Sequence, residues 1–153
     1  DLNSSDLAVP VYAAAIHRVY NIDSSFGDGP EFPLVYLIST TDDGAGLDVP
    51  LTAPQTLSAD LQQALTAALA DQPFEIIWVP RVDDVPLDGQ GRIADGEGIY
   101  IILGNILPQA DGRVHLPFFM VCGPLCLTGK VYVLSEVEGT WQVTGDTGLV
   151  IQG

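Results

Sequence analysis

The sequence has little charge, and very little of it is positive. Charged residues make up only 16% of the chain, with four Arg and one Lys against 20 acidic residues, so the net charge is −15 at pH 7. Binding to nucleic acid or to an anionic membrane surface requires clustered Lys and Arg, so neither partner is expected. No run of 18 apolar residues is present, and the sequence therefore predicts no direct membrane insertion.

Common catalytic signatures are also missing. The sequence has no G-x-S-x-G, H-E-x-x-H or Walker loop, and the glycines of GQGRIADGEG precede a strand-like run instead of a helix. Only two histidines occur. We interpret His17 as a residue at the solvent boundary of a helix rather than as a general base or metal ligand. These absences favour a non-enzymatic protein.

The length of 153 residues fits a single domain spanning 1–153, with a core that needs no extra cross-links. The polar lead-in DLNSSD, residues 1–6, is predicted to be flexible. The chain starts with Asp instead of Met, as is typical after removal of a signal peptide or tether. We therefore expect an extracytoplasmic bacterial protein, either secreted or anchored at the surface.

Apolar runs rich in β-branched and aromatic residues dominate the last third of the chain. Between 98 and 152 they are separated by ADG, CGPLC and VEGT, which predicts a four-stranded antiparallel meander. Two earlier strands are predicted at 34–40 and 74–79. Amphipathic helices are predicted at about 7–20 and after the N-cap Ser58. The predicted fold is α+β, with a curved antiparallel sheet packed by two helices.

Three strand runs, IYIIL, FFMV and VYVL, are continuously apolar instead of alternating. Both faces of the sheet centre are therefore predicted to be covered. Two helices can cover only one face. The other requires the long loops at 21–33 and 41–56, a ligand or another subunit, and we expect a homodimer. Pro117, inside a strand, predicts a β-bulge that curves the sheet, and Pro10 is expected in the first turn of its helix.

The acidic segment RVDDVPLDGQGRIADGEG matches part of a calcium loop. Counting from Asp84 as position one places Asp88 at position five and Asp95 at position twelve of an EF-hand pattern. Pro86, at position three, offers no side-chain oxygen, and a solvated turn has the same composition. Calcium is therefore an alternative, and no other cofactor is predicted. A second acidic loop, with Asp42, Asp43 and Asp48, has the same two interpretations.

The motif CGPLC is similar to the CGPC of thioredoxin-type oxidoreductases with a leucine inserted. The redox motif places its first Cys at a helix N-terminus, which lowers the thiol pKa, whereas the flanks here are strand-like. A tight turn of three residues allows the Cα separation that a disulfide requires. We predict a structural disulfide between Cys122 and Cys126. A pair of thiols is the second alternative and a catalytic dithiol the third.

The closing segment YVLSEVEGTWQV, residues 132–143, is similar to the last hairpin of small secreted bacterial domains with cystatin-like and NTF2-like architectures. The resemblance implies a curved antiparallel sheet wrapped on an N-terminal helix. Such folds host binding modules, dimerisation domains and some enzymes, so the resemblance does not select a function.

Three function hypotheses remain. The first is a non-enzymatic extracytoplasmic binding or protein-interaction domain. The second is an enzyme with an Asp or Glu as acid or base, in an apolar pocket between the first helix and the sheet. That pocket would be lined by Tyr12, Tyr20, Tyr100 and Tyr132. The third is a calcium-stabilised module with ligands Asp84, Asp88 and Asp95.

Overall fold

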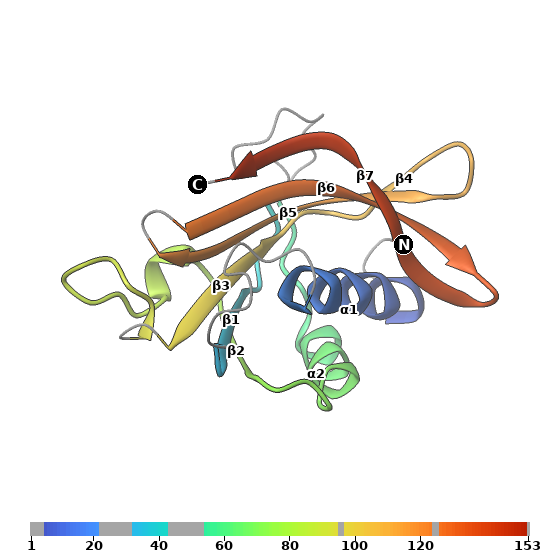
Figure 1. The fold of residues 1–153 in the computed structure, drawn as a ribbon. Coiled ribbons are helices and arrows are strands. Elements are labelled where there is room, and N and C mark those ends of the chain that lie inside the picture. Colours follow the sequence, from blue (N-terminus) through green and yellow to red (C-terminus); the bar gives the residue numbers. More distant parts are fainter. Residues whose placement is uncertain (1–4, 22–31, 43–53, 95–96, 124–125, 153) are drawn as a thin grey trace.

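A computed structural model describes residues 5–21, 32–42, 54–94, 97–123 and 126–152 (Figure 1). Two α-helices pack against a single seven-stranded sheet in these residues. The predicted α+β class is confirmed.

Both predicted helices are present. Helix α1 spans Ser5–Asn21 and helix α2 spans Ala59–Ala68. Because α1 starts before residue 7, Pro10 lies inside the helix instead of in its first turn, which corrects the predicted start. The predicted N-cap of α2 is confirmed, since the Ser58 hydroxyl accepts a hydrogen bond from a first-turn amide at 3.1 Å. Neither described helix is long and apolar enough to cross a bilayer.

The sheet combines a parallel and an antiparallel half. Its strands are β1 Leu34–Ile38, β2 Glu75–Val79, β3 Gly98–Leu103, β4 Leu107–Pro108, β5 Val114–Gly123, β6 Cys126–Val137 and β7 Thr140–Gln152. The order is β2-β1-β3-β5-β6-β7, with β4 paired to β5. Strands β3, β5, β6 and β7 form the predicted antiparallel meander.

The prediction that the whole sheet is antiparallel is wrong for its first three strands. Strand β1 pairs in parallel with both β2 and β3. Helix α2 lies between β1 and β2 in the chain. It returns the chain to the end of the sheet where β1 begins, so β2 runs in the same direction as β1. The sheet is therefore mixed.

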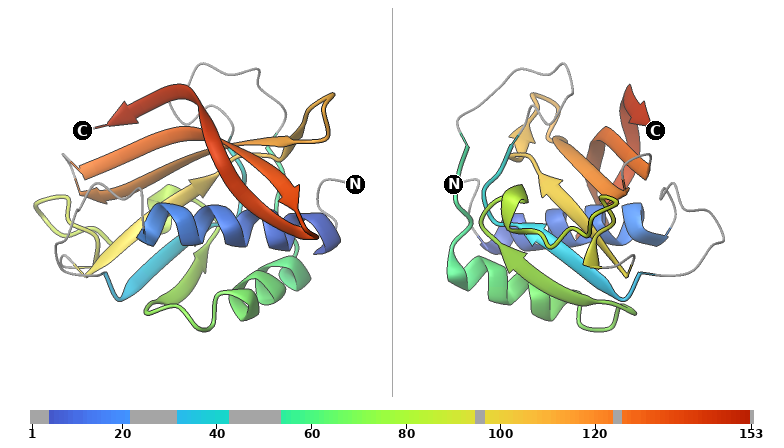
Figure 2. Two further views of the ribbon diagram at one scale, coloured as in Figure 1. Left: turned by 45° about the vertical axis from the view of Figure 1, so that its right-hand side comes forward. Right: turned by 90° about the vertical axis from the view of Figure 1, so that its left-hand side faces the viewer.

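Helices α1 and α2 cover the same face of the sheet, which we call the helix face (Figure 2). Alternate residues of the strands point into this core and are almost fully buried. The largest of them include Leu37, Ile99, Ile101, Leu103, Phe118 and Tyr132. They pack against Tyr12 and Ile16 of α1 and Leu61 and Leu65 of α2.

The opposite face, which we call the far face, is partly covered by the chain that joins β2 to β3. This crossing segment, residues 80–97, includes the short 3-10 helix Val82–Asp84. Val85 and Ile93 of the segment are 4% and 0% exposed and pack in one cluster with Tyr36 and Ile38 of β1. The acidic segment thus covers the far face at β1, whereas the prediction was made for the runs in β3, β5 and β6, where Tyr100 and Phe119 are only half-buried. The two long loops predicted for this role lie mostly outside the described residues.

Pro117 lies in β5 without a bulge. The register between β5 and β6 is continuous from Val114 to Val121 and shifts only beyond Val121. The Pro117 carbonyl accepts a hydrogen bond from the Gly104 amide at 2.7 Å, so the proline nitrogen faces the end of β3 on the same side. No ladder bond to β6 is lost, and the bulge predicted at Pro117 is wrong. Two further shifts lie between β6 and β7, which curves over β6 in Figure 1.

One buried hydroxyl has no hydrogen-bond partner among the residues that the structure describes. Thr128 is 0% exposed, and its Oγ1 is unpaired. Replacing Thr128 by Val keeps the branched shape and removes this desolvated group, so we expect the free energy of unfolding to rise by about 1 kcal/mol. Urea unfolding measures the change. The control is Thr144→Val, because the exposed Thr144 hydroxyl donates to the Val133 carbonyl at 3.3 Å. A less stable Thr128→Val protein would contradict the prediction.

Candidate functional site

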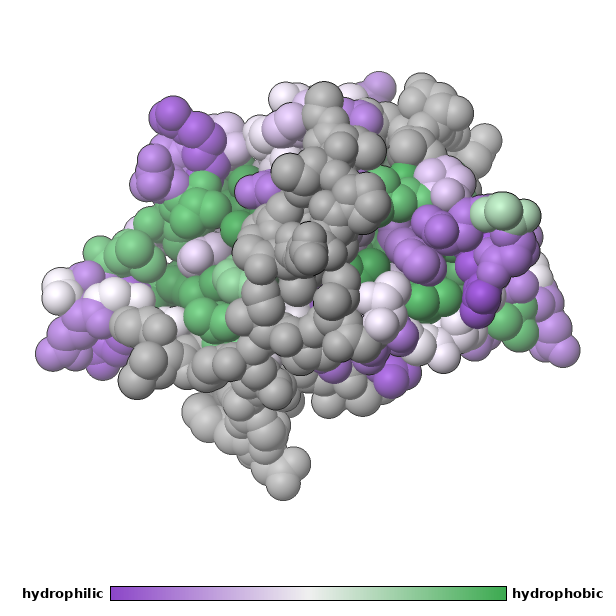
Figure 3. Space-filling model, turned by 90° about the horizontal axis from the view of Figure 1, so that it is seen from above, coloured by the Kyte–Doolittle hydropathy of each residue, from purple (hydrophilic) through white to green (hydrophobic). Residues whose placement is uncertain are grey.

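An apolar groove of about 330 Å3 lies on the far face, between the crossing segment and strands β3, β5 and β6. Its lining consists of Leu87, Gly91, Ile93, Tyr100, Phe119, Val121, Gly123 and Leu127. Leu87 is 57% exposed, and Tyr100, Phe119, Val121 and Leu127 are half-buried. Figure 3, seen from the side opposite the helices, shows apolar side chains gathered on this side of the molecule. We call this hollow the far-face groove.

The strands beneath the far-face groove carry no charge on that side. By strand alternation, the far-face residues of β3, β5 and β6 are Gly98, Tyr100, Ile102, His115, Pro117, Phe119, Val121, Gly123, Leu127, Gly129, Val131, Val133, Ser135 and Val137. None of them is Asp, Glu, Lys or Arg. Burial raises the pKa of Tyr100, so its phenol stays neutral at physiological pH. This neutrality stands out in a chain with a net charge of −15.

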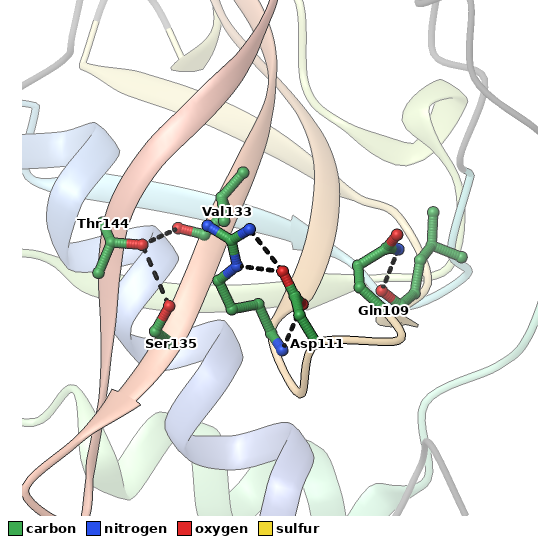
Figure 4. A network of polar contacts seen from close by, with 7 residues as sticks. Gln109, Asp111, Val133, Ser135 and Thr144 are labelled. Atoms are coloured by element: carbon green, nitrogen blue, oxygen red, sulfur yellow. Dashed lines mark hydrogen bonds and ion pairs between the residues drawn. The ribbon is translucent and has the colours of Figure 1, made fainter.

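In two exposed turns, an acidic side chain forms an ion pair with a nearby arginine, so that their charges cancel. One of these turns joins β4 to β5, and the other lies in the crossing segment. In the β4–β5 turn, Asp111 accepts hydrogen bonds from the Arg113 amide at 3.1 Å and from its Nε at 2.7 Å (Figure 4). The side-chain bond from Arg113 lowers the pKa of Asp111, and the same bond raises the pKa of Arg113. Ser135 and Thr144 join β6 to β7 nearby through uncharged hydroxyls 3.3 Å apart.

The crossing segment contains the predicted calcium ligands, and the described ones face arginines. Asp88 Oδ2 accepts a hydrogen bond from Arg92 Nε at 2.7 Å, and its Oδ1 accepts the Arg92 and Gln90 amides at 2.9 and 2.8 Å. The Arg92 amide contributes most to lowering the pKa of Asp88. Asp84 lies 3.8 Å from Arg81 Nε. Asp95 is outside the described residues.

The described residues contain no group of three His, Cys, Asp or Glu side chains that could hold a metal ion. Of the second acidic loop only Asp42 is described, and its amide donates to the Leu103 carbonyl at 2.9 Å. Asp43 and Asp48 lie outside the described residues. The calcium hypothesis therefore stays a prediction, and the described residues do not bring its proposed ligands together.

We expect excess EDTA to leave the melting temperature unchanged, because Asp88 is already bound by Arg92 and two backbone amides. Differential scanning calorimetry with EDTA and with millimolar calcium tests this. A metal ion that binds the folded state raises the melting temperature. A rise with calcium that EDTA reverses would restore the calcium hypothesis.

The four tyrosines predicted to line a pocket do not share one cavity. Tyr12, Tyr20 and Tyr132 belong to the helix-face core, whereas Tyr100 packs with the far-face cluster. Two of the hydroxyls stabilise the fold: Tyr12 donates to the Gly104 carbonyl at 2.9 Å, and Tyr20 donates to a backbone carbonyl at 2.8 Å.

A second hollow, of about 460 Å3, lies between α1, the end of α2 and the β6–β7 hairpin. It brings together His17, Asp71, Glu136 and Trp141, which are distant in sequence. His17 is exposed, in agreement with its interpretation as a boundary residue. This grouping could not be predicted from the sequence, because each residue comes from a different part of the fold.

A third hollow, of about 440 Å3, lies between α2 and the edge strand β2. Its lining consists of Trp78 and the α2 residues and neighbours Ala59, Gln62, Gln63, Thr66, Ala67 and Ala70. Trp78 Nε1 donates a hydrogen bond to Thr66 Oγ1 at 2.9 Å and so ties the strand to the helix. We call this hollow the α2–β2 groove. Sequence reasoning missed it, although the small residues at helical spacing were a visible signal.

The two cysteines lie at the hairpin between β5 and β6. Gly123 pairs with Cys126 across a short turn, and the register shifts beside Cys122. Cys122 is 8% exposed. The side chain of Cys126 lies outside the described residues, so the disulfide stays a prediction.

No family model, curated protein or solved structure matches the chain. The cystatin-like and NTF2-like resemblance therefore rests on the closing hairpin alone, and the parallel strands β2, β1 and β3 depart from the antiparallel sheet that it implies.

Proposed function

We propose that the chain is a non-enzymatic, extracytoplasmic binding domain that forms a homodimer through its far-face groove. The observation that carries the proposal is the uncharged, half-exposed apolar surface formed by Tyr100, Phe119, Val121 and Leu127 beside the exposed Leu87. Exposed apolar surface of this kind marks interaction sites in soluble proteins.

The charge distribution indicates the far face as the surface where a second copy can bind. Two chains of net charge −15 repel each other wherever their acidic side chains meet. The far-face positions of β3, β5 and β6 carry none, and Asp88 beside the groove is paired with Arg92. Two copies can therefore meet there with the least repulsion, in a self-complementary arrangement that is common for dimers.

The dimer is tested by light scattering at micromolar concentration. We expect a mass near twice the 16.2 kDa of one chain. Leu87→Glu should give a monomer, because it places a charge in the groove. Val137→Glu is the matched control, since Val137 is also an exposed apolar residue, at 39%, but lies at the hairpin end of β6. A wild-type mass of one chain that does not change with concentration would overturn the proposal.

The extracytoplasmic location is supported by the disulfide predicted between Cys122 and Cys126, since such bonds persist in oxidising compartments. We expect mass spectrometry of the non-reduced protein to show a mass two hydrogens lower than after reduction. The peptide carrying both cysteines should resist alkylation until it is reduced. Two alkylated cysteines in non-reduced protein would contradict the disulfide and remove this support.

The enzyme and calcium alternatives have no comparable observation in their favour. The tyrosines of the enzyme hypothesis divide between the two faces of the sheet. The described acids of the calcium hypothesis face arginines.

A further inference from the structure

Strand β2 forms one edge of the sheet, and among the described strands it pairs only with β1. The Glu75 amide donates to the Pro33 carbonyl at 2.8 Å, and the Val79 carbonyl accepts from the Ser39 amide at 2.8 Å. Since main-chain groups alternate along a strand, Glu75, Ile77 and Val79 face β1. The amides and carbonyls of Ile76 and Trp78 therefore point away from the sheet.

This edge has few of the features that normally prevent strand pairing. Edge strands are usually protected by charged residues, above all Lys, by Pro or by a bulge, and the sequence of β2, EIIWV, has no Lys or Pro and carries its one charge, Glu75, at its first residue. Its register with β1 is continuous from Glu75 to Val79. Two outward residues with one donor and one acceptor each are thus available to a further strand.

The α2–β2 groove lies beside this edge, on the helix face. Trp78 belongs to both, because its backbone faces outward and its indole lines the groove. The groove-lining residues of α2 recur at helical spacing along the helix, and the small side chains of Ala59, Ala67 and Ala70 leave room for the side chains of a ligand. Leu61 and Leu65 on the opposite side of α2 are buried in the core, so they hold the helix in place on its side of the groove.

We propose that the α2–β2 groove binds an extended peptide segment of a partner protein. The peptide adds to β2 as a strand through the main-chain groups of Ile76 and Trp78. Every second side chain then enters the groove, where Trp78 and the three alanines of the lining select small or branched apolar residues.

The charges around the groove favour particular residue types at the two ends of the peptide. No ionisable side chain lines the groove itself. The exposed acids Asp60 and Asp71 are the chain neighbours of the lining residues Ala59 and Ala70, and α2 has no basic residue. Lys or Arg on either side of the apolar positions is therefore favoured by electrostatic attraction.

The test selects binders from a library of random peptides about nine residues long, which exceeds the length of the edge strand. We expect the selected peptides to carry apolar residues at alternate positions and basic residues at the flanks. Ala67→Gln, which fills the groove, should weaken binding of a selected peptide roughly tenfold. Ala68→Gln is the matched control, because Ala68 is the next exposed residue of α2 but lines the hollow beside His17.

Methylated peptides test strand addition directly. Two methylated versions of a selected peptide are compared, one with methyl groups on its odd-numbered amides and one with them on its even-numbered amides. One version should lose binding and the other should bind as before, because only alternate amides would bond to β2. Failure to select any peptide, equal binding by the Ala67→Gln and wild-type proteins, or methylation tolerated in both versions would each overturn the proposal. A change in the mass of the protein in solution with Ala67→Gln would assign the groove to a second copy and also overturn it.

Discussion

Replacement of Gly104 by Ala is expected to lower the free energy of unfolding by about 3 kcal/mol. A Cβ atom at this position would lie 2.8 Å from the Pro117 carbonyl oxygen and 3.0 Å from the Pro117 Cβ. Neither strand can move easily, because the Gly104 amide donates to that same oxygen at 2.7 Å and the Gly104 carbonyl accepts the Tyr12 hydroxyl at 2.9 Å. One methyl group would therefore disturb contacts among α1, β3 and β5.

Urea unfolding of the purified variant measures this loss, and failure to obtain folded Gly104→Ala protein would agree with it. Gly145→Ala is the control, because a Cβ at Gly145 has no atom within 4 Å. That variant should stay within about 0.5 kcal/mol of the wild type. Equal stability of the two variants would show that the end of β3 adapts to the added methyl group.

Phe118→Ala should be at least as destabilising, at about 3 to 5 kcal/mol, whereas Phe119→Ala should cost under about 2 kcal/mol. The two residues are adjacent in β5 and point to opposite faces. Phe118 is 1% exposed in the helix-face core, and the centroid of its ring lies 4.5 Å from the ring centroid of Tyr132. Phe119 is half-buried in the far-face groove.

Thermal and urea unfolding at low protein concentration compare the two variants as monomers. Light scattering then measures the effect that only Phe119→Ala should have, a weaker dimer. If Phe119→Ala were the more destabilising change, the far face would be a closed core and the proposed interface would have no free surface.

The elements of this fold could be predicted from local sequence patterns, but the direction of the early strands could not. The N-cap Ser58 and the turns of the C-terminal meander identify their elements through short-range signals. The pairing of β1 depends on residues far away, since Leu34 lies between Glu75 and Gly98. The order strand, helix, strand over 34–79 was the available sign of parallel pairing.

The candidate sites were harder to predict because continuous apolar strands hide which face a residue occupies. Tyr100 lies between Ile99 and Ile101, both 0% exposed, and no polar alternation shows that it points the other way. In the crossing segment, Val85 and Ile93 are isolated among acids and glycines, yet they are the residues that bury that segment against β1. The α2–β2 groove required knowledge that β2 is an edge strand.

The position of β1 at the centre of the parallel half also determines how the chain must fold. Leu34 pairs with Gly98, 64 residues later, and the chain between them contains α2, β2 and the crossing segment. As synthesis proceeds from the N-terminus, α1 and β1 emerge long before the antiparallel strands that complete their core. We therefore expect the N-terminal half to be unstable until the last strands are present. Such non-local pairing is typical of domains that refold over milliseconds to seconds.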